Sequence, residues 1–111
     1  MKNSESLKKN RDFQMVYRQR NSRANRLLIM YVSKNQLEKN RLGISVSKKV
    51  GNSVVRHRLA RLIRESYRLD EQSFLLGFDI VVVAREQAKL SSYAQIKEAL
   101  LHLAKCHKVL K

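Results

Sequence analysis

Basic side chains are concentrated between residues 48 and 68, and their types and spacing suit the binding of phosphate groups. At the 100° step of a helix, His57, Arg61, Arg64 and Arg68 form one stripe along the solvent side. Arg56 and Arg58 flank this stripe at the first turn of the helix. Guanidinium groups in particular form strong paired hydrogen bonds with phosphate oxygens. The basic residues of this segment are Lys48, Lys49, Arg56, His57, Arg58, Arg61, Arg64 and Arg68.

The start of this predicted helix adds to the anion-binding character. Gly51 precedes Asn52 and Ser53, and either of the latter two can cap a free backbone N–H. Because a helix N-terminus carries free N–H groups and a partial positive charge, it attracts phosphate. The opposite face of the helix is apolar and expected to be buried, and it consists of Val55, Leu59, Leu62, Ile63 and Leu69.

The overall charge favours a polyanionic partner. The chain has 24 Lys and Arg against 9 Asp and Glu, and this net charge of +15 destabilises a small fold unless a polyanion lies against it. The alternative is an ordinary solvated helix face. Such a face mixes acidic and basic residues, whereas Glu65 is the single acid among the basic residues of this helix, which argues against the alternative. Nucleic acid is therefore the expected partner.

A membrane surface is the other common polyanion. The chain has no apolar run near the roughly 20 residues that a membrane-spanning helix needs. Residues 1–13 are polar and lack the apolar segment of a secretory signal. We therefore expect a cytoplasmic protein without a membrane partner.

Three aromatic residues offer a second kind of contact. Phe13, Tyr17 and Tyr31 could form a platform for unpaired bases, because every base has a face that stacks on an aromatic ring. The alternative is plain core packing, which suits Phe13 best, since phenylalanine is a usual interior residue. The tyrosines are better suited to a wet groove, because their hydroxyl groups tolerate water.

Side chains that could catalyse a reaction do not form a recognisable set. His57 lies far along the chain from His102 and His107, and no nucleophile or carboxylate accompanies it. Cys106 is the only cysteine, so a disulfide within the chain is excluded, and no Cys/His spacing resembles a zinc site. The acids are scattered and do not form the cluster that two-metal phosphoryl chemistry requires. They include Asp12, Glu65, Asp70, Glu71 and Asp79. We expect no catalytic residue, metal site, cofactor or small-molecule substrate for the protein alone.

The length and the absence of a Pro/Gly-rich linker predict one domain over residues 1–111. A short helix is predicted over residues 10–20, capped by Asn10 and with Asp12 in its first turn. The first nine residues are predicted to be loose. A closing helix is predicted from Ser92 onward, because apolar residues recur there at helical spacing.

Apolar patterns predict strands over residues 26–33, 41–47 and 78–85. The polar stretch between the first two predicts a hairpin loop. The crossover through the basic helix favours parallel pairing of the strand that precedes it with the strand that follows it. Together the elements predict a two-layer α/β sandwich whose sheet has one incompletely covered face.

The segment KKVGNSVVRHRLARLIRE, residues 48–65, strongly resembles the signature of the bacterial ribonuclease P protein subunit. The likeness extends to residues 12–17, Asn25-Arg26, RLGISVS at 41–47 and FDIVVVAR at 78–85. It implies an α+β fold of order α-β-β-β-α-β-α, like the second domain of a small-subunit ribosomal protein. It also implies a left-handed βαβ crossover, which general rules disfavour.

The resemblance also implies a function. The protein would be the non-catalytic subunit of an endoribonuclease, an RNA-binding protein in a ribonucleoprotein whose catalytic RNA, with magnesium, removes the 5′ leader of precursor tRNA. The resemblance places the contact with the catalytic RNA at Lys48, Lys49, Asn52, Arg56, His57, Arg58, Arg61, Arg64 and Arg68. It places the leader at Phe13, Tyr17 and Tyr31.

Two positions depart from the family pattern. The family usually has asparagine where His57 stands and often lysine or arginine at Ala60. Two alternatives remain beside this resemblance. One is a ribosomal or general RNA-binding structural protein. The other is a helix-turn-helix DNA regulator using residues 53–69, although strands flank this helix where a companion helix is expected.

Overall fold

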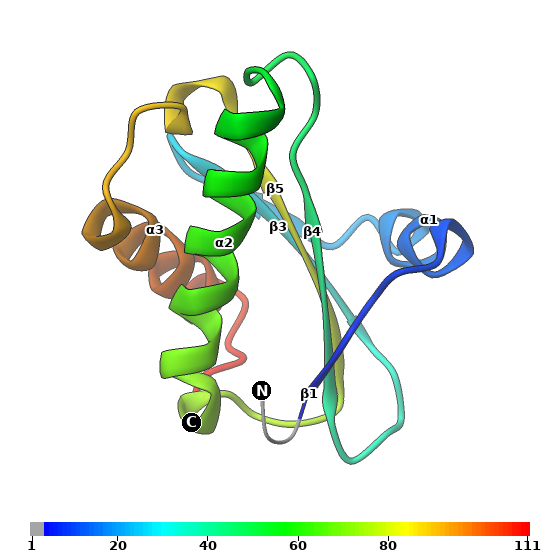
Figure 1. Ribbon diagram of the computed structural model, residues 1–111. Helices are drawn as coiled ribbons and strands as arrows, with labels where there is room; N and C mark the ends of the chain where they lie inside the picture. Colours follow the sequence, from blue (N-terminus) through cyan, green and yellow to red (C-terminus); the bar gives the residue numbers. More distant parts are fainter. Residues whose placement is uncertain (1–3) are drawn as a thin grey trace.

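The computed structural model describes residues 4–111, which form a five-stranded sheet and three α-helices (Figure 1). The strands are β1 (Ser4–Ser6), β2 (Ser22–Ala24), β3 (Leu28–Lys34), β4 (Asn40–Ser45) and β5 (Phe78–Ala84). The helices are α1 (Asn10–Arg18), α2 (Ser53–Leu69) and α3 (Tyr93–Cys106). The predicted order α-β-β-β-α-β-α is therefore confirmed, with β1 added before α1.

The sheet has the strand order β1-β4-β5-β3-β2. β4 pairs with β1 and β5 in parallel, whereas β3 is antiparallel to β5 and to β2. The predicted parallel pairing across the basic helix is confirmed. The predicted hairpin between β3 and β4 is wrong, because β5 lies between them. β5 carries a continuous apolar run that is buried on both faces, so it takes the central place in the sheet.

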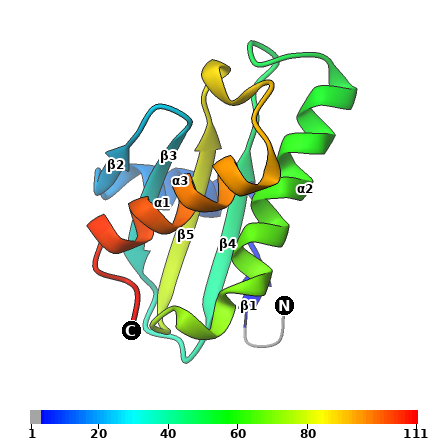
Figure 2. The same cartoon turned by 90° about the vertical axis from the view of Figure 1, so that its left-hand side faces the viewer.

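The connection from β4 through α2 to β5 is left-handed. Seen from the side of α2 and α3 with β4 and β5 running upward, β5 lies to the left of β4 (Figure 2). This is the less common hand for a parallel crossover. It confirms the topology implied by the family resemblance.

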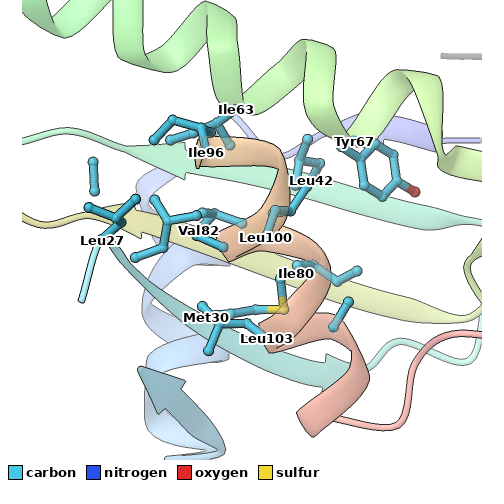
Figure 3. Close-up of a cluster of buried hydrophobic side chains, with 14 of the residues drawn as sticks. Leu27, Met30, Leu42, Ile63, Tyr67, Ile80, Val82, Ile96, Leu100 and Leu103 are labelled. Carbon is cyan, nitrogen blue, oxygen red and sulfur yellow. The ribbon is translucent and has the colours of Figure 1, made fainter. Parts of the chain in front are cut away.

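The sheet separates a main core from a smaller one. α2 and α3 cover one face, and α1 lies across part of the other (Figure 1). Figure 3 shows side chains of the sheet, including Ile80 and Val82, facing Leu100 and Leu103 of α3 in the main core. The smaller cluster, under α1, consists of Leu7, Val16 and Val81 with partly buried aromatic residues. The predicted helical layer on one face and partial cover on the other are thus confirmed.

The caps of the two long helices follow the local sequence. Asn52 caps α2, its Oδ1 accepting from the N–H of Val55 at 3.0 Å. Ser92 caps α3 in a capping box, in which Ser92 and Gln95 each satisfy a backbone N–H of the other. Both starts agree with the sequence analysis.

One member of the predicted apolar arc of α2 is wrong. Leu69 is 55% exposed, whereas Leu59 and Ile63 are fully buried. At 100° per residue the buried arc is centred near Leu59, Ile63 and Ser66, which leaves Leu69 at its margin and at the last residue of the helix. Tyr67 fills the core at this end, and its ring packs against Phe74 at a centroid distance of 4.8 Å.

The prediction of loose first residues is wrong for residues 4–9, while Met1–Asn3 lie outside the described residues. β1 pairs with the edge of β4, and Ser4 Oγ lies 2.6 Å from the hydroxyl of buried Tyr67. A polar three-residue edge strand has no apolar alternation, so its sequence does not reveal it. The cap at Asn10 is also wrong: α1 is preceded by Lys9, which caps only through its backbone, although Asp12 does lie in the first turn.

Candidate nucleic-acid interface

The predicted basic stripe lies exposed on the outer side of α2. Its members are His57, Arg61, Arg64 and Arg68. Arg68 Nη2 lies 2.7 Å from Glu65 Oε2, and this hydrogen-bonded pair lowers the pKa of the Glu65 carboxyl. Arg61 and Arg64 form no ion pair within residues 4–111. They are therefore the members of the stripe best placed to bind phosphate.

The two arginines that flank the stripe are more enclosed. Arg58 is half-buried, and its Nη2 donates to the carbonyl of Ser91 at 2.6 Å, which ties α2 to the loop before α3. Arg56 is also half-buried, and its Nε is shielded from solvent without a hydrogen-bond partner among the described residues. Arg56 and Arg58 therefore carry positive charge at the side of the stripe and are also packed into the fold.

The turn that leads into α2 brings further charge to the helix start. Lys48 and Lys49 are exposed, while Val50 beside them is buried and anchors the turn. Asn52 follows, exposed and capping the helix. The predicted convergence of lysines with a capped helix N-terminus is present in the structure, and it makes this end of α2 strongly attractive to anions.

The three aromatic residues meet between α1 and β3. The Tyr17 and Tyr31 rings contact edge to face with centroids 4.8 Å apart, and Phe13 lies 6.4 Å from Tyr17. All three side chains are half-buried, and all pack against the small cluster around Val81. Burial raises the pKa of the Tyr17 phenol, against the lowering effect of its hydrogen bond with Ser45. The cluster is thus both a small core and a partly open aromatic surface.

Gly43 sets how closely Phe13 can approach the sheet. A Cβ atom at Gly43 would lie 2.7 Å from Cζ of Phe13 and 3.2 Å from Cβ of Leu7. The contact with Phe13 is far inside ordinary van der Waals distance, and the contact with Leu7 is tight. The Phe13 ring therefore lies directly on the bare backbone of β4, and the glycine is part of the aromatic site.

A hollow of about 320 Å³ lies near one end of this aromatic surface. Its lining includes Ile29 from β3, Lys49 from the turn before α2, and Arg85 just after β5. Ile29 shares a face of β3 with Tyr31, whereas Val50 and Ala84, which also line the hollow, belong to the main core, so the hollow lies at the end of the sheet rather than on one face. Arg85 Nη1 donates to the carbonyl of Asn25 at 2.8 Å, which orients the guanidinium.

Sequence reasoning missed Arg85 and Gly43 as parts of this surface and gave Lys49 only one of its two positions. Arg85 could have been found, because it follows a strand whose alternation places it on the face of Val81 and Val83. Lys49 was assigned to the anion-binding start of α2, yet it also lines this hollow. The role of Gly43 depends on where α1 crosses the sheet, and the local sequence carries no signal for that.

The two surfaces lie on different sides of the molecule. α2 lies on one face of the sheet and α1 on the other (Figure 1). The basic stripe and the aromatic residues therefore do not form one continuous site. Lys49 lies in the turn before α2 and also lines the hollow at the end of the sheet, so one long or folded polyanion, or two separate ones, could occupy both surfaces.

The remaining reactive side chains are dispersed. Within residues 4–111, no three His, Cys, Asp or Glu side chains gather closely enough to hold a metal ion. His57 is exposed on α2, whereas His107 lies 2.8 Å from the carbonyl of Met30, and burial lowers its pKa. Cys106 lies 3.6 Å from His102 at the end of α3. None of the described helices is long and apolar enough to cross a membrane.

Comparison with known proteins adds a family to this geometry. The family model described as Ribonuclease P matches residues 1–108. A ribonuclease P protein component from Lachnoclostridium phytofermentans is 60% identical over 96% of this chain and 92% of its own length. The corresponding protein of Alkaliphilus metalliredigens is 53% identical over 99% of both chains.

Solved structures agree with the sequence comparison. The RNase P protein of Staphylococcus aureus superposes with a TM-score of 0.88 at 42% identity, covering 96% of this chain and 97% of its own. The RNase P protein of Thermotoga maritima superposes with a TM-score of 0.84 at 32% identity, covering 92% and 96%. The similarity therefore extends over nearly the whole chain in both sequence and fold.

Proposed function

The chain belongs to the ribonuclease P protein family, and on that premise we propose that it binds the catalytic RNA of ribonuclease P and the 5′ leader of precursor tRNA. The protein is a component of an endoribonuclease that processes tRNA. In our proposal the RNA subunit, with its magnesium ions, performs the hydrolysis, and the protein contributes binding. The observation that supports the proposal is that an exposed row of cations on α2 and a partly open aromatic cluster beside α1 lie on opposite faces of one sheet.

The surface along α2 is assigned to the catalytic RNA. Folded RNA is recognised mainly through its phosphate backbone and shape, and a rigid helix with a cationic side suits such a target. Arg61 and Arg64 are exposed, and neither forms an ion pair with an acid among residues 4–111. The proposed contacts with the catalytic RNA are Lys48, Lys49, Asn52, Arg56, His57, Arg58, Arg61, Arg64 and Arg68.

The surface beside α1 is assigned to the leader. A single strand exposes its bases, which stack on aromatic rings without regard to sequence. Phe13, Tyr17 and Tyr31 supply the rings, and Arg85 with Lys49 supplies positive charge near the same face of the sheet. Because leaders differ in sequence, stacking plus phosphate neutralisation suits this substrate better than a base-specific pocket.

The combined arrangement explains how a small protein can favour substrate over product. In this proposal the aromatic surface contacts the leader, a segment that the precursor carries and mature tRNA lacks. Binding of the leader therefore stabilises the precursor complex selectively. The protein also lowers the demand for magnesium, since its cations neutralise phosphates that metal ions would otherwise screen.

Reconstituted cleavage tests the proposal. Precursor tRNA is incubated at low magnesium with the protein, with a ribonuclease P catalytic RNA, or with both. We expect leader removal only with both components, with the mature 5′ end as the product. If the protein binds RNA but does not assist the catalytic RNA, a general structural role in RNA binding takes the place of this function.

A further inference from the structure

Helix α1 separates the aromatic surface of Phe13, Tyr17 and Tyr31 from a hollow of about 230 Å³ that is lined mostly by polar side chains. The helix lines this hollow with Asp12, Met15 and Gln19, and the sheet lines it with Arg41 and Asp79. At 100° per residue, Phe13 and Tyr17 lie on a different side of α1 from these residues. Contacts in the polar hollow can therefore set the position of α1 without touching RNA in the groove.

Arg41 is held firmly in this hollow by the central strand. Its Nε donates to Asp79 Oδ1 at 2.8 Å and its Nη2 donates to Asp79 Oδ2 at 2.6 Å. Asp79 is only 7% exposed, and its Oδ1 also accepts from Asn35 Nδ2 at 2.9 Å. A planar guanidinium bonded through two nitrogens has little freedom to rotate. The remaining nitrogen, Nη1, is thereby directed at a fixed point.

That nitrogen faces helix α1. Arg41 Nη1 lies 3.8 Å from Asp12 Oδ2, and the two side chains keep 28% and 18% of their surfaces exposed. Arg41 and Gly43 are two residues apart on one face of β4. Asp12 lies against Arg41, and the next residue, Phe13, lies on Gly43. The first turn of α1 is thus matched to alternate residues of β4.

Other restraints on this end of α1 are few. The helix has no side-chain cap at its start. Its apolar contacts belong to the small cluster of Leu7, Val16 and Val81. Such contacts are non-directional and do not by themselves fix the rotation of a helix. The ion pair supplies a directional contact at the residue beside Phe13.

We propose that Arg41, fixed by Asp79, is a positioning residue that sets α1 through Asp12 and thereby holds Phe13 and Tyr17 in the geometry that binds the leader. This inference rests on the proposed leader-binding function. It makes the ion pair a determinant of the preference for precursor over mature tRNA. Binding of the catalytic RNA, which is assigned to α2 on the other face, does not depend on it.

Two substitutions act on the pair from opposite sides. Asp12→Asn removes the charge from the helix and preserves its shape, and Arg41→Lys keeps the charge and removes the fork that Asp79 orients. Glu5→Gln is the matched control, because Glu5 is the register partner of Arg41 on β1 and pairs with Lys39 rather than with α1. It alters the local charge as Asp12→Asn does. Tyr17→Ala serves as the reference for a damaged groove.

The measurement is the ratio of affinities of the reconstituted complex for leader-bearing and mature tRNA. We expect Asp12→Asn and Arg41→Lys each to lower this ratio about fivefold, the size expected for loss of a partly buried ion pair. Affinity for the catalytic RNA should stay at the wild-type value, and Glu5→Gln should keep the full ratio. In the protein alone, the nuclear Overhauser contact between the Phe13 ring and the Gly43 α-protons should weaken in both variants.

The outcomes separate the two ideas. If Tyr17→Ala lowers the ratio while Asp12→Asn and Arg41→Lys leave it unchanged, the positioning role is wrong and the leader groove stands. An unchanged Phe13 to Gly43 contact in both variants also contradicts positioning. If Tyr17→Ala leaves the ratio unchanged, the leader-binding function itself fails, and the inference fails with it.

Discussion

At the scale of single residues, the packing of the aromatic cluster depends on the absence of a side chain at Gly43. Replacing Gly43 with alanine places a methyl group within 3 Å of the Phe13 ring, so the ring must move outward or β4 must shift. We expect Gly43→Ala to lower the free energy of unfolding by about 1–3 kcal/mol, as overpacking does. Chemical denaturation measures this loss.

A double-mutant cycle checks the cause of that loss. A Phe13→Leu substitution shortens the side chain that meets the added methyl group, so the double variant should be more stable than the sum of the two single losses predicts. Additive losses would show that Gly43 acts through something other than the Phe13 ring.

His107 gives the second prediction at this scale. Burial lowers its pKa below the ordinary 6.5, so the folded protein binds this proton less readily than the unfolded chain does. The contribution of His107 to the free energy of unfolding is therefore fully present above about pH 6.5. This contribution is lost as the pH is lowered from there through the depressed pKa. Thermal unfolding at pH 7 and pH 5 measures this, and His107→Gln should flatten the difference. An identical pH dependence in the variant would remove His107 from the account.

The residue types predicted which side chains form the candidate site, but they did not predict how far each of these side chains is buried. The basic stripe follows from periodicity alone, because the exposed side of an amphipathic helix is set by its buried side. Half-burial of Arg58 depends on the carbonyl of Ser91, which a later loop brings into reach. The mixed nature of Phe13, partly core and partly surface, likewise depends on where α1 crosses β4.

At the scale of elements, α2 carries a row of exposed cations, and the salt dependence of RNA binding tests whether these cations contact phosphates. Arg61→Ala or Arg64→Ala should weaken binding to the catalytic RNA and reduce the slope of log affinity against log salt, by about 0.7–0.9 for each lost phosphate contact. Lys105→Ala removes one exposed charge from α3 and is the control. A slope that changes equally in all variants would indicate nonspecific attraction and contradict docking along α2.

The elements themselves differ in how far the sequence predicted them. α2, α3 and β5 have strong periodic or continuous apolar patterns and recognisable caps, and each appears where expected. β1 has three polar or charged residues and owes its existence to the free edge of β4, a tertiary effect that a local pattern does not contain. The sequence analysis paired β3 with β4, because the two strands are consecutive in the chain. In the structure the buried apolar strand β5 lies between β3 and β4, which is again a tertiary effect.

At the scale of the whole molecule, a sheet with helices on both faces keeps the two proposed RNA-binding surfaces apart. We therefore expect substitutions in the stripe of α2 to weaken binding of the catalytic RNA without affecting the leader. Substitutions in the aromatic surface beside α1 should weaken binding of the leader without affecting the catalytic RNA. The left-handed crossover contributes to this separation, because it places α2 on the β4 side of the sheet, on the face opposite α1 (Figures 1 and 2). A single continuous site would couple the two functions in every variant.

The most direct test is to measure, in the reconstituted complex, the affinity for leader-bearing and for mature tRNA with wild-type protein, Tyr17→Ala and Arg64→Ala. We predict that Tyr17→Ala weakens binding of the leader-bearing tRNA by about 1–3 kcal/mol per stacked base and leaves mature tRNA unchanged. Arg64→Ala should weaken assembly with the catalytic RNA while the assembled complex keeps its preference. Equal losses for both tRNAs with Tyr17→Ala would contradict the account.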